Sequence, residues 1–238
     1  MDFFGEEGFQ TIKESAVTVI GLGGVGCHAA IALARSGIGS LHLVDFDSVT
    51  ETSLNRNPLA GSRDCGSYKV DVVSKQLRST CPATEITVLK EFFHSDTAGL
   101  VFSQRPDAAV DAIDSLNPKA ELIRYCVSNG ITLFSSMGAS GRSNPSLVRT
   151  GDIFETSCCP LARQLRKYLR KRGVTEGVPC VYSIEKAGDH SLPPDKEELT
   201  YERGRVRNRI PSLITMPGIF GYTLAGMVLE HLSGKAGE

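Results

Sequence analysis

The chain has 238 residues, 41% of them hydrophobic and 22% charged, which is typical of a globular protein with one large α/β domain or one and a half small ones. The formal net charge of -1 excludes a protein that is basic over its whole surface. Residues 1–150 hold 13 Lys/Arg against 16 Asp/Glu, and residues 151–238 hold 13 against 11, so a phosphate-rich partner is expected at the second part.

The first 150 residues alternate short apolar runs with helical patterns. The run at residues 16–21 is continuous, which is typical of a strand buried on both faces, and the glycines after it lead into a helix that ends at Gly37. The predicted strands are 16–21, 40–45, 85–90, 108–112 and 131–135, and the predicted helices are 3–13, 27–37, 68–79 and 118–128.

After about residue 150 this alternation stops. We expect a basic helix at 161–172, a strand at 178–182, a polar mobile loop at 186–209 and a buried closing helix at 214–232. The closing segment contains proline and glycines and does not predict a membrane span. The whole pattern predicts a Rossmann-like, doubly wound α/β fold with a mainly parallel sheet. Residues 1–150 would form its core and residues 151–238 a C-terminal α/β extension of the same domain.

Four glycines, Gly21, Gly23, Gly24 and Gly26, stand between the first predicted strand and the helix after it. Glycines allow a tight turn and a close approach of the backbone to phosphate, which the helix N-terminus also attracts. Asp45 ends the next strand, 19 residues beyond Gly26, which suits a carboxylate that holds a ribose hydroxyl. These features predict an adenine nucleotide site, and they fit NAD as well as ATP.

Residues further along the chain favour ATP. Arg56 and Lys69 would not be needed beside the pyrophosphate of a dehydrogenase cofactor. They are needed where a carboxylate attacks an α-phosphate, because negative charge then builds up on the phosphates. Asp114 ends a central strand and could hold Mg²⁺ through oxygen.

The order G-x-G-G-x-G, D-x-D, N-R, K and D-x-x-D resembles the superfamily of ThiF, MoeB and the ubiquitin-activating enzymes. The resemblance covers residues 3–150 and departs at Ser53 and Asn57, where members often have Asn and Gln, and in having no arginine before Arg35. It implies that the four glycines line the site, Asp45 binds the ribose, Asp47 and Asn55 order the phosphate end, Arg56 and Lys69 contact phosphates, and Asp114 binds Mg²⁺.

A narrower resemblance extends through most of the chain. No C-x-x-C pair is present, although sulfur-carrier activators usually have two. Five segments are similar to the tRNA threonylcarbamoyladenosine dehydratase branch: 111–119 (with Pro118–Lys119), 136–145, 159–174, 179–183 and 217–221. This branch uses ATP to activate the carboxylate of the modified adenosine and then closes a ring, which releases AMP and pyrophosphate. It also implies tRNA as substrate, a homodimer, and a monovalent cation site without a recognisable ligand set.

The basic helix independently favours RNA. Its apolar residues recur every three to four positions, which leaves the cations on the outer face. Such a face would supply the salt-sensitive part of RNA binding, although it is also typical of a solvated helix. Its six cations are Arg163, Arg166, Lys167, Arg170, Lys171 and Arg172, and a second basic run contains Arg203, Arg205, Arg207 and Arg209.

Seven cysteines without a C-x-x-C motif or a signal-like start favour reduced thiols and a cytoplasmic protein. Cys180, in a predicted strand, is expected to be a buried hydrophobic residue more than a nucleophile, and a catalytic role is not expected for Cys158 and Cys159 either. Three alternatives stay open: an activator of a ubiquitin-like or sulfur-carrier protein, an inactive nucleotide-binding subunit, and an NAD-dependent dehydrogenase.

Overall fold

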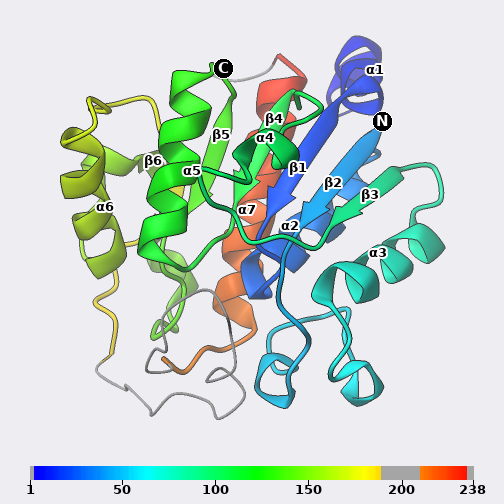
Figure 1. Ribbon diagram of the computed structural model, residues 1–238, viewed down its shortest axis with the longest axis horizontal. Coiled ribbons are helices and arrows are strands. Elements are labelled where there is room, and N and C mark those ends of the chain that lie inside the picture. Colours follow the sequence, from blue (N-terminus) through cyan, green and yellow to red (C-terminus); the bar gives the residue numbers. More distant parts are fainter. Residues whose placement is uncertain (1–2, 189–209, 235–238) are drawn as a thin grey trace.

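In the computed structural model, which describes residues 3–188 and 210–234, seven strands form one sheet (Figure 1). The strand order is β3-β2-β1-β4-β5-β7-β6, and all neighbours are parallel except β6, which pairs antiparallel with β7 at the edge. The strands are β1 (Ala16–Ile20), β2 (Ser40–Val44), β3 (Glu85–Leu89), β4 (Ala108–Asp111), β5 (Leu133–Ser136), β6 (Val148–Asp152) and β7 (Pro179–Ser183).

Helices cover both faces of the sheet, and each face has its own hydrophobic core. One core joins α1, α2, α3 and α7 to the sheet, and the other joins α4, α5 and α6 to it. Figure 1 shows α5 in front of the sheet and α7 behind it. The helices are α1 (Gly5–Glu14), α2 (Gly24–Arg35), α3 (Lys69–Thr80), α4 (Ala98–Val101), α5 (Leu116–Ser128), α6 (Pro160–Arg170) and α7 (Thr215–Leu232).

The strand order creates a switch point between β1 and β4. The chain leaves β1 towards β2 on one side, whereas β4 continues to β5 on the other. In doubly wound sheets a crevice opens at such a point, beyond the carboxyl ends of the strands. The glycine loop follows β1 and the turn with Asp114 follows β4, so the fold brings these two motifs to the same edge.

The helix α7 packs closely on α2 through small residues. A Cβ on Gly221 would lie 2.4 Å from the carbonyl oxygen of Val25, so only glycine allows this approach. The predicted buried closing helix is thus confirmed. Within the part of the chain that the structure describes, no helix combines the length and apolarity needed to cross a bilayer.

The predicted α/β fold is confirmed, with differences at one edge strand and two helices. Strand β6 was not predicted, because the sequence of this edge strand, VRTGD, lacks an apolar run. The short helix α4 was also missed, and α5 begins two residues before the predicted position. The second basic run, and the polar loop beyond residue 188, lie outside the described residues.

Candidate nucleotide site

The glycine loop between β1 and α2 is tightly packed on one side and open on the other. Gly21 has a φ of +91°, and a Cβ on it would lie 2.9 Å from the carbonyl of Ala112. A Cβ on Gly26 would overlap the oxygen of Gly21. At Gly23, the N-cap of α2, a Cβ would meet nothing within 4 Å. The loop is therefore open at the helix N-terminus, where N–H groups without intrahelical partners can bind phosphate.

Asp45 directly follows β2 and ties the glycine loop to that strand. Its carboxylate accepts hydrogen bonds from the backbone N–H of Leu22 and, at 2.7 Å, of Asp47. Burial raises the pKa of the Asp45 carboxyl, while the nearby Lys69 cation opposes this shift. A carboxylate has further acceptor positions after two hydrogen bonds, so Asp45 can also accept a ribose hydroxyl.

Lys69 and Asp47 form an ion pair next to Asp45. The Lys69 Nζ lies 2.7 Å from Asp47 Oδ2, and the Lys69 N–H donates to the Asp47 carbonyl at 2.9 Å. The side chains are only 12% and 26% exposed, respectively. Lys69 is the first residue of α3, so this pair holds a cation at the same edge as the glycine loop.

The loop with Asn55 and Arg56 packs on the start of α2. A Cβ on Gly24 would lie 3.3 Å from the Cβ of Arg56. The Arg56 Nη1 donates to the Thr52 carbonyl at 2.6 Å and to Asn55 Oδ1 at 3.3 Å, and Asn55 Nδ2 donates to the Ser212 carbonyl at 3.0 Å. Arg56 therefore lies beside the glycine loop, and Asn55 connects it to the segment before α7.

Ser53 and Asn57, which depart from the superfamily pattern, stabilise this turn from within. Both are buried. The Ser53 Oγ donates to the Thr50 carbonyl at 2.7 Å and accepts from the Thr50 N–H at 3.0 Å, and Asn57 Oδ1 accepts from the Leu59 N–H at 3.0 Å. These side chains thus form hydrogen bonds with backbone N–H and carbonyl groups on both sides of Arg56.

Asp114 lies in an exposed turn between β4 and α5, and a buried cluster that the sequence analysis missed lies behind it. The Asp111 carboxylate accepts from Lys119 Nζ at 2.5 Å, from Ser135 Oγ at 2.6 Å and from the Ile113 N–H at 3.0 Å. Asp111, Lys119 and Ser135 are all 0% exposed. A lysine eight residues after an acidic strand end, on the apolar side of a helix, is the signal that could have indicated this pair.

The end of the sheet where the parallel strands have their carboxyl ends thus carries the glycine loop, Asp45, Arg56, Lys69 and Asp114. A family model described as the ThiF family matches residues 1–238, the whole chain. The chain belongs to the ThiF family.

Two relatives of this ThiF-family chain are named tRNA threonylcarbamoyladenosine dehydratases. It is 37% identical over 251 residues to tRNA threonylcarbamoyladenosine dehydratase 2 of Saccharomyces cerevisiae, covering 99% of this chain and 56% of that protein. It is 35% identical to the tRNA threonylcarbamoyladenosine dehydratase of Bacillus subtilis, covering 96% of this chain and 91% of that protein. The chain therefore spans about half the length of the yeast relative and most of the bacterial one.

A solved structure supports the same relationship. The crystal structure of the Escherichia coli tRNA N6-threonylcarbamoyladenosine dehydratase in complex with ATP superposes with a TM-score of 0.85 at 31% identity. The match covers 98% of this chain and 91% of that one. Similarity at this level extends to the C-terminal part of the fold as well as to the glycine loop.

Three of the six cations of the basic helix have partners within the fold of this ThiF-family chain. The Arg166 Nη1 donates to the Thr156 carbonyl at 3.0 Å, which ties α6 to the turn after β6. Arg170 lies 5.2 Å from the ring of Phe154, and Arg172 lies 4.5 Å from the ring of Tyr168. Arg166 thus supports the local structure, and the guanidinium groups of Arg170 and Arg172 stack on aromatic rings.

The other three cations form an exposed stripe. Arg163, Lys167 and Lys171 are spaced four residues apart, which places them on one side of α6 and its final turn. The opposite side, with Ala162, Leu165 and Leu169, is buried. Figure 1 shows α6 beside α5, at the other end of the molecule from α3. We call Arg163, Lys167 and Lys171 the basic stripe.

The prediction that Cys180 is a buried strand residue is confirmed. Cys180 is 0% exposed in β7, and burial, followed by the nearby Asp152 carboxylate, raises its pKa to about 12. Its thiol therefore stays protonated near neutral pH, whereas a nucleophilic cysteine needs a thiolate. Cys159 is also buried, and Cys158 is exposed with a φ of 56°.

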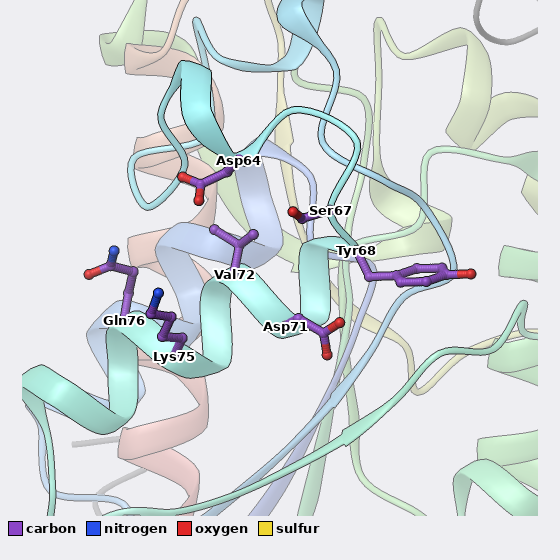
Figure 2. Close-up of a pocket in the computed structure, with 7 residues that line it drawn as sticks. All are labelled: Asp64, Ser67, Tyr68, Asp71, Val72, Lys75 and Gln76. Atoms are coloured by element: carbon purple, nitrogen blue, oxygen red, sulfur yellow. The ribbon is translucent and has the colours of Figure 1, made fainter.

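A hollow of about 280 Å³ lies outside the nucleotide site, between α3 and the loop before it. Figure 2 shows Lys75 and Gln76 on the same side as Asp64, and Asp71 and Tyr68 on the other side. None of the residues predicted to bind nucleotide is among those that line this hollow. Acidic and basic side chains both line the hollow and none of them belongs to the glycine loop, which remains the candidate nucleotide site.

Proposed function

We propose that this chain is an ATP-dependent dehydratase that acts on threonylcarbamoyladenosine in tRNA. The observation that carries the proposal is the open glycine loop at the switch point, with Asp45, Lys69 and Arg56 around it. Similarity to proteins named tRNA threonylcarbamoyladenosine dehydratase over 96% to 99% of the chain supports the substrate.

The reaction has two steps. The carboxylate of the modified adenosine attacks the α-phosphorus of ATP, and the bond between this phosphorus and the oxygen that bridges to the β-phosphate breaks. The products of this step are an acyl adenylate and pyrophosphate. A nucleophile within the same nucleoside then attacks the activated carbonyl and expels AMP, so the nucleoside loses one water. Because both reacting groups belong to the substrate, the protein contributes mainly orientation and electrostatic stabilisation.

The residues of the site divide this work. The N-terminus of α2 and the open side of Gly23 would receive the phosphates, and Asp45 would accept a ribose hydroxyl. Lys69 and Arg56 would stabilise the negative charge that develops on the phosphates in the transition state. Asp47 supports this role because its ion pair keeps Lys69 in place.

The site also fits Mg²⁺. Asp114 is exposed in the turn whose Ala112 packs against Gly21, and Mg²⁺ is usually held by one or two carboxylates together with substrate phosphates. We propose that Asp114 holds this ion, which when bound supplies positive charge that neutralises the phosphates. A dedicated cluster of three or more metal-binding side chains is absent from residues 3–188 and 210–234.

The basic stripe would contact the tRNA backbone. Three exposed cations on one side of a helix supply sequence-independent affinity that falls with salt. Arg170 and Arg172, also exposed, lie near the stripe, whereas Arg166 is committed to Thr156. We therefore assign RNA binding to the stripe in the first place.

We also propose a homodimer, which the superfamily resemblance implies. Ile214 is the N-cap of α7 and Tyr222 lies eight residues further along the helix, and both are exposed apolar side chains that a second copy could cover. Light scattering at micromolar concentration would give twice the chain mass if the proposal holds. We further propose a monovalent cation, which only the resemblance implies, and a cytoplasmic location, which the cysteine pattern favours.

Activation of a ubiquitin-like or sulfur-carrier protein is the second candidate. Its adenylation step would use the same nucleotide site, but a subsequent thioester would need a reactive cysteine. Cys180 does not meet this need because it is buried and protonated. The substrate test below separates the two.

The deciding experiment is pyrophosphate release from ATP and Mg²⁺ with two tRNAs. One carries threonylcarbamoyladenosine and the other is the same tRNA without it. Release only with the modified tRNA, together with loss of one water from that nucleoside by mass spectrometry, is the expected result. Release that instead requires a carrier protein ending in Gly-Gly would replace the dehydratase with the second candidate.

A further inference from the structure

The buried cluster of Asp111, Lys119 and Ser135 has no part in the roles assigned above. Lys119 and Asp111 form an ion pair with both side chains 0% exposed. Burying two charges removes their hydration, and such pairs can often be replaced by apolar residues without loss of stability. Stability alone therefore does not account for this pair, and its position beside the Asp114 turn suggests another purpose.

The cluster determines the path of the turn. One oxygen of the Asp111 carboxylate accepts from the Ile113 N–H, and the other accepts from Lys119 and Ser135. All three hydrogen bonds have normal or short lengths and leave the carboxylate a single orientation. The first bend of the turn, at Ile113, is thus fixed by a side chain that Lys119 and Ser135 hold in place.

The same turn packs against the glycine loop. The Ala112 N–H donates to the Ile20 carbonyl at 2.9 Å, and a Cβ on Gly21 would lie only 2.9 Å from the Ala112 carbonyl. A Cβ on Gly26 would lie 3.2 Å from the Ala112 Cβ. The turn is therefore confined between the glycine loop on one side and the buried cluster on the other.

Lys119 also connects the C-terminal end of the turn, at the start of α5, to Asp111 at its N-terminal end. It lies in the first part of α5, and its N–H donates to the Ser115 carbonyl at 3.1 Å. The ion pair to Asp111 thus joins the two ends of the segment 111–119, in which Asp114 is the exposed acidic residue. A change in the Asp111 carboxylate would move the backbone that carries Asp114.

We infer that Lys119 is a positioning residue: through Asp111 it sets the place of the Asp114 carboxylate relative to the phosphates bound at the glycine loop. The inference rests on the proposed function only in assigning Asp114 to Mg²⁺. Groups that orient a metal ligand in this way typically change metal affinity when they are altered, with the fold retained.

The test is the affinity for ATP, by calorimetry without tRNA, in Mg²⁺ and in EDTA. The variant is the double substitution Asp111→Asn with Lys119→Met, which removes both buried charges together and leaves neither unpaired. We expect the strengthening of ATP binding by Mg²⁺ to fall by about 10- to 100-fold, with affinity in EDTA unchanged. The matched control is Ile123→Ala, which removes a fully buried side chain from the same helix and should leave both affinities unchanged.

Two results would overturn the inference. One is a double variant that binds ATP in Mg²⁺ as the wild type does. The other is an equal loss of affinity in Mg²⁺ and in EDTA, which is the signature of a merely structural role. If the double variant does not fold, Ser135→Ala is the deciding variant, because it removes one donor to Asp111 and keeps the ion pair. Its affinity for ATP should fall by a smaller factor, and only in Mg²⁺.

These binding measurements stand apart from the dehydratase assignment. A wild type that binds ATP more tightly with Mg²⁺, and variants that lose this gain, would support the role of Lys119 even if modified tRNA gave no pyrophosphate. In that case only the proposed substrate would fail.

Discussion

The carboxyl edge of the sheet and the exposed side of α6 use charge in opposite ways. At the sheet edge, Asp45, Asp111 and Lys119 are buried, and their polar atoms bond to backbone groups or to one another. On α6, the basic stripe is exposed, with its cations spaced along one side. The first arrangement holds atoms at defined distances, and the second presents charge to solvent.

This difference follows from what each region is proposed to bind. Phosphoryl transfer needs charges at fixed positions, because preorganised groups do not have to reorient in the transition state. A tRNA backbone offers phosphates at many places, so mobile exposed cations suffice. Substitutions at the sheet edge should therefore affect catalysis steeply, and those on α6 should affect binding gradually.

The largest effect is expected from Asp114→Ala. Loss of the proposed Mg²⁺ ligand should lower the rate of pyrophosphate release by about 100-fold or more, because stabilisation of phosphate charge is lost in the transition state. The Asp114 side chain is exposed, so the melting temperature should stay close to that of the wild type. A variant that keeps its rate would remove Asp114 from the site.

The two sides of the glycine loop can be separated by Gly26→Ala and Gly23→Ala. At Gly26 a methyl group would overlap the Gly21 oxygen, so we expect a loss of about 1–3 kcal/mol in the free energy of unfolding. At Gly23 it would meet nothing, so the fold should remain and only ATP affinity should fall. Urea unfolding and ATP titration together measure both effects; unchanged ATP affinity in Gly23→Ala would argue against phosphate on that side.

The basic stripe should show its role in the salt dependence of tRNA binding. Replacing Arg163, Lys167 and Lys171 by Gln should raise the apparent KM for tRNA and reduce the slope of log K against log salt by about 2–3 units. ATP affinity should not change. Arg166→Gln is the control, since loss of its bond to Thr156 should lower the melting temperature without reducing the slope.

The smallest effect is expected from Cys180→Ala. Pyrophosphate release should be unchanged, and stability should fall by about 1 kcal/mol, as for a small loss of buried volume. Burial raises the Cys180 pKa from 9.0 to about 12, so the unfolded chain releases this proton first. The contribution of the Cys180 proton to the free energy of unfolding is complete below pH 9.0 and is lost as the pH rises towards about 12. The free energy of unfolding of Cys180→Ala should not show this decrease. A large loss of activity at neutral pH would restore the carrier-protein candidate.

The sequence alone determined the parts of this protein that depend on neighbouring residues. The strand, glycine turn and helix at the start of the core were predicted because strand burial, glycine geometry and helix periodicity are local properties. The same holds for the order of Asp45, Arg56, Lys69 and Asp114 along the chain, which by itself predicts an ATP site. Strand β6 was not predicted, because an edge strand that is largely exposed needs no apolar pattern.

Only the tertiary structure decided which charges are paired. The Asn55 side chain donates to the carbonyl of Ser212, 157 residues further along the chain. Lys119 donates to Asp111 and Ser135 at a buried position near the carboxyl ends of β4 and β5. Likewise, Arg166 and Lys167 are adjacent in one basic run, yet one bonds to Thr156 and the other is exposed. A sequence pattern places a residue on an element, but its partner depends on which elements the fold brings within hydrogen-bonding distance.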